Sequence, residues 1–200
     1  GTGISNPLQV TVQNSIACYC TSGGGTAADG ITRVIFNTID NSSSGASSYS
    51  DFTSQSTTLQ RGQTVPLSVY VNTDGGYTTR QMAWIDWNQN GVFDDYEAYN
   101  LGTAQGVTNG ISSLCPFDIT VPENAVSGTT FMRISSQYNA YSSPCQTFKY
   151  GEVEDYKIIV VDAGGPPSCT SPISPSIGET AVAINANLFW NEAFGATSYD

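Results

Sequence analysis

The stretch from Asp86 to Glu97 has the residue types and the spacing of a calcium-binding loop. It reads DWNQNGVFDDYE and matches the pattern D-x-[DN]-x-[DN]-G-x5-E at every fixed position. The expected ligands are the side-chain oxygens of Asp86, Asn88, Asn90, Asp94 and Glu97 and the backbone carbonyl of Val92. Oxygen ligands without nitrogen or sulfur favour Ca²⁺ over transition metals. The alternative is an ordinary turn with solvated acids, because Asn-Gly is itself a hairpin signal.

A second group of carboxylates lies in YGEVEDYKIIV, from Tyr150 to Val160. Because side chains alternate along a strand, Glu152 and Glu154 share a face with apolar residues. A carboxylate buried without a partner is costly. Either the strand is bulged at Gly151 and both glutamates point to solvent, or a cation lies beside them. We expect Glu154 or Glu152 to be a further calcium ligand, with Arg133 as the other candidate partner.

Catalysis by this chain is not expected. The sequence has no histidine, which excludes Ser-His-Asp, Cys-His and HExxH sites. A pair of carboxylates can hydrolyse a glycoside, but the best carboxylates are already assigned to calcium, and no others cluster in the sequence.

Aromatic side chains near turns suggest a binding function instead. Exposed tyrosine and tryptophan rings contact sugars and proteins through an apolar face and a polar group. Most such residues in this chain are expected in the core or packed under loops. Tyr138 and Tyr141, in SQYNAYSSP, are the better candidates for exposed ligand-binding residues.

The composition is that of a secreted, loop-rich β-protein. Charged residues make up 12% of the 200 residues, about half the usual share. The net charge of −11 argues against nucleic acid and anionic membrane surfaces as partners. No apolar run approaches the roughly 20 residues that span a bilayer. Five cysteines without a CxxC pair favour disulfides in an oxidising compartment over a zinc site.

Strand-like segments separated by turn-rich stretches dominate the chain, and no amphipathic helix is evident. We therefore expect an all-β fold, an antiparallel β-sandwich of jelly-roll-like type. The expected strands are residues 8–12, 31–36, 65–71, 82–87, 117–121, 130–135 and 150–161.

A domain boundary is expected at DAGGPPSCTSP, because Gly and Pro end the last strand there. Residues 162–167 would be a linker. Residues 168–200 resemble the start of a fibronectin type III domain, with Trp190 and Tyr199 at matching positions. Since two or three short strands are not stable alone, we expect the chain to be a piece of a longer protein. Residues 1–17 would then be the end of a preceding module or a linker.

Five segments of the chain carry a resemblance to a known family. They are YCTSGG (19–24), SSYSDFT (47–53), WIDWNQNGVFDD (84–95), FMRIS (131–135) and PCQTFKYGEVEDY (144–156). Together they resemble the GEVED domain, a β-module of secreted multidomain proteins of Bacteroidetes-type bacteria. That family occurs beside fibronectin type III repeats, hydrolase domains and a sorting domain of type IX secretion. The resemblance covers residues 18–161.

The resemblance implies a secreted or cell-surface location and a calcium-dependent, non-catalytic role. It also implies a disulfide between Cys20 and Cys145, which leaves Cys18 and Cys115 as an additional pair and Cys169 with a partner beyond Asp200. We expect an accessory or adhesion module that binds carbohydrate or a cell-surface protein, alongside other domains of the same longer chain. The alternatives are a purely structural spacer and an accessory region of a secreted hydrolase, such as a metallopeptidase or glycoside hydrolase, whose active site lies elsewhere.

Overall fold

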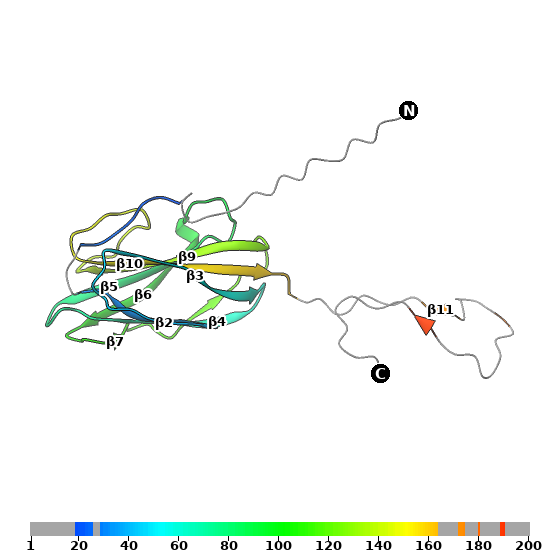
Figure 1. Ribbon diagram of the computed structural model, residues 1–200, viewed down its shortest axis with the longest axis horizontal. Helices are drawn as coiled ribbons and strands as arrows, with labels where there is room; N and C mark the ends of the chain where they lie inside the picture. The colour runs from blue at the N-terminus through cyan, green and yellow to red at the C-terminus, as the bar shows by residue number, and fades with distance from the viewer. Residues whose placement is uncertain (1–18, 26–28, 164–171, 175–179, 181–188, 191–200) are drawn as a thin grey trace, which may run out of the picture. The chain divides into compact units, whose positions relative to one another are not determined.

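The computed structural model describes residues 19–25, 29–163, 172–174, 180 and 189–190. The chain divides into two compact units, residues 1–161 and 162–200, and each is described by itself. The first unit contains two β-sheets, which Figure 1 shows packed face to face.

Each sheet of the first unit has five strands. The first sheet contains β2 (Ile39–Ser42), β1 (Ile31–Phe36), β4 (Thr64–Val71) and β7 (Gly110–Ile111) in that order, with β8 (Phe117–Thr120) also paired to β4. The second contains β3 (Tyr49–Gln60), β10 (Gly151–Val161), β9 (Gly128–Tyr138), β5 (Thr78–Ile85) and β6 (Ala98–Gln105) in that order. A short 3-10 turn, η2 (Asp95–Glu97), precedes β6.

The expected all-β sandwich is confirmed, and one strand pair departs from the antiparallel arrangement. β10 runs antiparallel to β9 on one side and parallel to β3 on the other. The second sheet is therefore mixed. The remaining strand pairs of the described chain are antiparallel.

The main hydrophobic core lies between the two sheets. β9 contributes Met132 and Ile134 to it, and β10 contributes Tyr156, Ile158 and Val160. The alternate residues of these strands lie on the opposite face of the second sheet. There a smaller cluster of Tyr19, Trp84, Phe93 and Phe131 covers the sheet. Because β9 is covered on both faces, polar side chains on either face must find partners inside the protein.

The expected strands between residues 31 and 161 are present. β1 has the expected ends, and the other expected strands differ at one or both ends. β5 begins at Thr78 and ends at Ile85, so the expected strand over 82–87 overlaps only its last residues. The expected strand at 8–12 lies outside the described residues. Sequence patterns did not indicate β2, β6, β7 or the 12-residue β3. β3 is rich in Ser and Thr because it is an edge strand and buries only a few side chains, Thr57 and Leu59 among them.

The described part of the second unit holds one short strand pair, β11 (Pro172–Ser174) with β12 (Phe189–Trp190). Tyr199 and Cys169 lie outside the described residues, so the fibronectin type III resemblance stays a prediction. Within the described residues, no helix is long and apolar enough to cross a membrane.

Candidate functional site

The Asp86–Glu97 loop follows directly after β5 and is organised around the buried side chain of Asp86. Its Oδ1 accepts a hydrogen bond from the Asn90 amide (3.2 Å), and its Oδ2 accepts one from the Gly91 amide (3.0 Å). The Tyr19 hydroxyl also donates to Oδ2. The loop turns sharply at Gly91, where φ is +83° and a glycine is favoured. Asp86 therefore sets the path of the first half of the loop.

Glu97 holds the second half of the loop to the first. Its Oε1 accepts hydrogen bonds from the amides of Trp87 (2.8 Å) and Asn88 (3.2 Å), and its Oε2 accepts one from the amide of Asp94 (3.1 Å). The side chain is fully buried, and this burial raises the pKa of Glu97, an effect that the three amides oppose. Glu97 thus stabilises the conformation of the loop and is also a candidate ligand.

Three other expected ligands converge on the outer side of the loop. Asp94 Oδ2 accepts hydrogen bonds from Asn88 Nδ2 (3.1 Å) and Asn90 Nδ2 (3.0 Å), and the Tyr96 hydroxyl donates to the same oxygen. These donors, Asn90 first, lower the pKa of Asp94. Val92 is exposed at the turn.

The oxygen-bearing side chains of this loop are of the type that binds calcium. Among the described residues, however, no group of three or more acidic or cysteine side chains lies close enough together to hold a metal ion. In the arrangement seen here, Asn88 and Asn90 present nitrogen to Asp94. Calcium binding requires these amides to present oxygen instead.

The structure does not bring Glu152 and Glu154 to this loop. The backbone of Asp86 is hydrogen-bonded to Phe131 and Thr130 on β9. Glu154, in contrast, is level with Ile134 in the β9–β10 register. At about 3.3 Å per residue, four residues along β9 correspond to roughly 13 Å. Glu152 lies two residues farther along the strand.

The alternative of a bulge at Gly151 with both glutamates in solvent is wrong, because both side chains are buried in the sandwich. Glu152 accepts hydrogen bonds from the Ile31 amide (3.0 Å) and the Ser50 hydroxyl (2.9 Å). Glu154 Oε2 accepts one from the Tyr156 hydroxyl (2.7 Å), and its Oε1 has no hydrogen-bond partner. Burial raises the pKa of Glu152 to about 7 and that of Glu154 to about 8.

Arg133, the other candidate partner of these glutamates, pairs with a different carboxylate. Side chains alternate along β9, so Arg133 lies on the opposite face of the sheet and forms a two-pronged ion pair with Asp155 (2.8 and 2.7 Å). The guanidinium also donates to the carbonyl oxygens of Cys20 and Pro144, both at 2.8 Å. Tyr49 donates to Asp155 at 2.8 Å.

The same region contains the expected disulfide between Cys20 and Cys145, which is confirmed. Cys18 lies outside the described residues, so its pairing with Cys115 stays a prediction. Within the described residues, Cys115 has no disulfide partner and packs against the main core.

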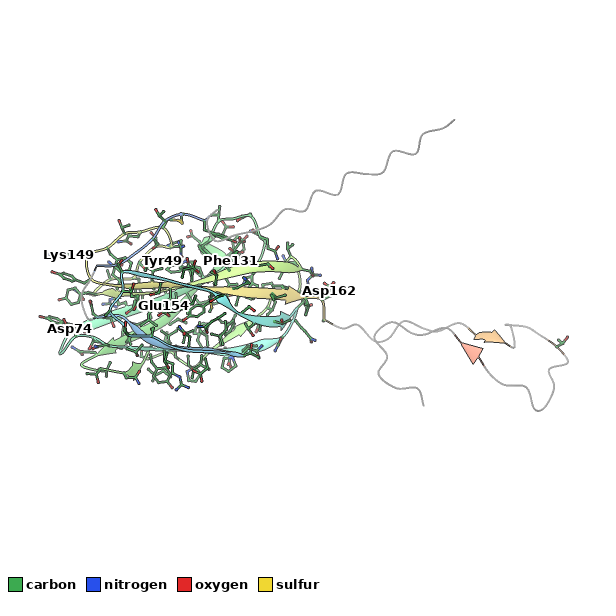
Figure 2. The ribbon with its side chains drawn as sticks, in the orientation of Figure 1. Tyr49, Asp74, Phe131, Lys149, Glu154 and Asp162 are labelled. Atoms are coloured by element: carbon green, nitrogen blue, oxygen red, sulfur yellow. A yellow bond between two sulfur atoms is a disulfide. The ribbon has the colours of Figure 1, made fainter. Side chains whose placement is uncertain are left out.

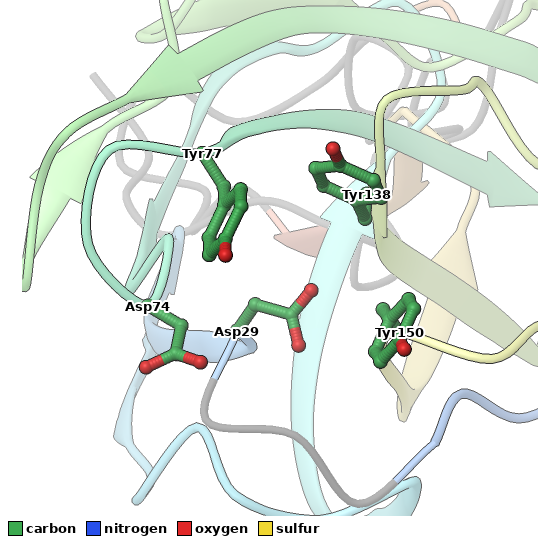
Figure 3. Close-up of a pocket in the computed structure, with 5 residues that line it drawn as sticks. All are labelled: Asp29, Asp74, Tyr77, Tyr138 and Tyr150. Carbon is green, nitrogen blue, oxygen red and sulfur yellow. The ribbon is translucent and has the colours of Figure 1, made fainter.

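The exposed tyrosines lie at the other end of β9. Tyr138 and Tyr141 are 38% and 42% exposed, as expected from the sequence. Tyr138 lines a pocket of about 310 Å³, but Tyr141 is not among the lining residues, and the Arg80 guanidinium lies 5.1 Å from its ring centre. We call this pocket the tyrosine pocket; it is lined by Asp29, Asp74, Tyr77, Tyr138 and Tyr150 (Figure 3).

Two carboxylates of the tyrosine pocket were missed by sequence reasoning. Asp29 precedes β1 and Asp74 lies between β4 and β5, each in a stretch that reads as a glycine-containing turn. Asp29 is 4% exposed, and its Oδ1 is buried without a hydrogen-bond partner. Burial raises the pKa of Asp29, and the charge of Asp74 adds to this rise. Only the fold places these turns beside Tyr138 and Tyr150.

Arg133 and Asp155, the aspartate of the GEVED sequence, form an ion pair between β9 and β10. The candidate calcium loop joins β5 to β6 in the same sheet. Residues 80–159 match the family model of the GEVED domain. The match runs from β5 nearly to the end of β10 and includes the loop, Cys145, Tyr138 and Tyr141. Asp29, Asp74 and Tyr77 lie outside it. A search of curated proteins found no match to the chain.

Proposed function

We propose that this chain is a non-catalytic, calcium-stabilised binding module of a larger secreted or cell-surface protein. Its binding surface is the end of the sandwich that carries the tyrosine pocket, and this surface contacts a carbohydrate or a protein. The observation that carries the proposal is the pocket itself. Three tyrosines that are 38–55% exposed line a hollow at the end of a sandwich whose strands hold them in place.

The arrangement of the rings supports a binding role. Tyr77 and Tyr138 meet edge to face with their centres 5.5 Å apart, and Tyr138 and Tyr150 do so at 6.0 Å. Each tyrosine is attached at or next to the end of a strand, Tyr77 before β5, Tyr138 on β9 and Tyr150 before β10. Rigid aromatic side chains of this kind provide contact area at a low cost in conformational entropy.

Calcium would be held by Asp86, Asn88, Asn90, Asp94 and the carbonyl of Val92, with Glu97 completing or bracing the loop. The ion would supply positive charge to a loop whose carboxylates otherwise rely on amide donors. Glu152 and Glu154 lie outside the proposed calcium site, because the β9–β10 register places them away from the loop.

An extracellular location is supported by the Cys20–Cys145 disulfide, because disulfides persist in oxidising compartments. The match to the GEVED family model agrees with an accessory module. The neighbouring domains, including any hydrolase, type IX sorting or fibronectin type III domain, belong to the proposed context.

The proposal is tested by screening the chain against a glycan array and against extracellular-matrix proteins in buffer with calcium. We expect binding that Tyr138→Ala weakens about tenfold or more, as for an aromatic hot spot. Tyr96→Ala is the matched control, because Tyr96 is 72% exposed but lies on the calcium loop. Absence of any binding would favour the spacer alternative.

A further inference from the structure

The tyrosine pocket has an unusual electrostatic character for a hollow lined by aromatic rings. Its two charged lining residues, Asp29 and Asp74, are both acidic. Figure 3 shows the Asp29 carboxylate in the middle of the group, between Asp74 and Tyr150 and facing the rings. A ligand that enters this hollow therefore meets negative charge together with the electron-rich faces of tyrosines.

Asp29 is the residue that points to a ligand. More than nine-tenths of its surface is buried, and Oδ1 has no hydrogen-bond donor. Leaving a buried carboxylate oxygen without a donor is costly, and native proteins satisfy most such groups. A cationic donor at this position would remove the cost.

The tyrosines around the pocket already contact cations of the protein itself. The Lys149 ammonium lies 4.9 Å from the centre of the Tyr150 ring, and the Arg80 guanidinium lies over Tyr141 nearby in the fold. Tyrosine faces attract ammonium and guanidinium groups when these come within about 6 Å. The rings at this end of the molecule are thus placed for contact with organic cations.

The volume of the pocket and the net charge of the chain restrict the class of ligand further. A volume of about 310 Å³ is at the small end of the roughly 300–1,000 Å³ seen for ligand pockets, which suits one side chain better than a long oligosaccharide. The chain carries 17 acidic and 6 basic residues, so its field attracts cations.

We propose that the tyrosine pocket binds an organic cation on an alkyl stem, the ammonium of a lysine or the guanidinium of an arginine side chain presented by a partner protein. The charged group pairs with Asp29, Asp74 supplies a second negative charge at the rim, and the stem packs against Tyr138 and its two neighbouring rings. This inference rests on the proposed function, because it names the class of ligand that the binding surface takes.

The test is an NMR titration of the chain with N-acetyl-lysine-methylamide and N-acetyl-arginine-methylamide, following the tyrosine ring signals. The neutral Nε-acetylated lysine derivative is the control ligand. We expect saturable shifts of Tyr77, Tyr138 and Tyr150 with the cations, weakened by added salt, and at least about tenfold weaker binding of the neutral derivative. A peptide with one lysine among glycines and serines should bind more tightly than the single residue if the source is a protein.

The key variant is Asp29→Asn, which removes the charge and keeps the shape. It should weaken cation binding about tenfold or more without lowering the melting temperature. Asp118→Asn is the matched control, since Asp118 is exposed on β8 and is not a lining residue. Asp74→Asn should have a smaller effect than Asp29→Asn because Asp74 is exposed.

Three outcomes would overturn the inference. The first is that the charged and neutral derivatives bind equally well, and the second is that Asp29→Asn leaves cation binding unchanged. The third is that calcium alone produces the same shifts of the tyrosine ring signals. If the cations fail while glycans on the array bind in a Tyr138-dependent manner, the proposed function stands and the cation inference falls. If no probe binds at this end, both fall.

Discussion

Carboxylates of this protein differ sharply in what surrounds them, although they lie within a few residues of each other. Asp155 is paired with Arg133 on one face of the second sheet, while Glu154 lies on the other face with one oxygen unpartnered. The protein therefore accommodates buried carboxylates in two ways. Asp155 is paired with the Arg133 guanidinium, whereas burial raises the pKa of Glu154, because it disfavours the charged form.

The buried glutamates make stability depend on pH. The pKa of Glu154 is about 8 in the folded protein against 4.5 for the ordinary residue, so the folded state binds more protons between these values. Its contribution is fully present below about pH 4.5 and is lost as the pH rises towards 8. We expect Glu154→Gln to reduce the loss of stability between pH 5 and pH 8, by up to about 1.4 kcal/mol per unit of pKa shift.

Urea unfolding at pH 5 and pH 8, with EDTA present, measures this effect. Glu123→Gln serves as the control because Glu123 is exposed between β8 and β9. A variant whose stability changed with pH as much as that of the native chain would contradict the prediction.

The Arg133–Asp155 pair is expected to be far more important for stability than the exposed pair of the same type. Asp155→Asn leaves the Arg133 charge buried without its partner, which costs about 3–5 kcal/mol. Asp40→Asn breaks the similar but exposed Arg33–Asp40 pair and should cost much less, because solvent screens the interaction. Chemical denaturation of the two variants compares them directly, and equal losses would show that burial does not decide the strength of the pair.

At the scale of elements, β10 depends on the glycine at its start. Gly151 has a φ of +124°, and an added Cβ would lie 1.9 Å from the Ser136 carbonyl oxygen on β9. No other residue type fits this backbone without a shift of the strand. This glycine lets β10 pair closely with β9 at the point where Glu152 enters the sandwich.

We therefore expect Gly151→Ala to destabilise the protein by about 3 kcal/mol or more, because it adds backbone strain to a steric overlap. Gly76→Ala is the control, since a Cβ there would meet nothing within 4 Å. Thermal unfolding measures both variants. Similar melting temperatures for the two would mean that β10 shifts without cost.

At the scale of the whole first unit, the two candidate sites lie at opposite ends of β9. The candidate calcium loop contacts Thr130 near the start of the strand, and Tyr138 ends it. Figure 2 labels Asp74 and Lys149 together at the pocket end of the sandwich. Calcium would consequently act on the pocket through the stability of the fold rather than by touching the ligand.

Bound calcium should stabilise the folded state by about 2.7 kcal/mol when its concentration exceeds Kd a hundredfold. For a chain of this size that corresponds to a rise of several degrees in the melting temperature. Scans with added calcium and with EDTA measure the difference, and Asp94→Ala should abolish it. Asp95→Ala is the matched control from the adjacent, exposed position. Equal melting temperatures of the native chain in both buffers would remove calcium from the proposal.

The sequence alone predicted which strand faces are buried and where the candidate loop lies. It did not predict which distant residues contact each other. Alternation of side chains identified the buried face of Glu152 and Glu154, and the spacing of oxygen-bearing residues located the candidate loop. Both patterns follow from the geometry of a short piece of backbone. What packs onto a face depends on strands that are distant in sequence. Only the tertiary structure could therefore decide that Arg133 pairs with Asp155, that β3 runs parallel to β10, and that Asp29 lies among tyrosines from three other segments.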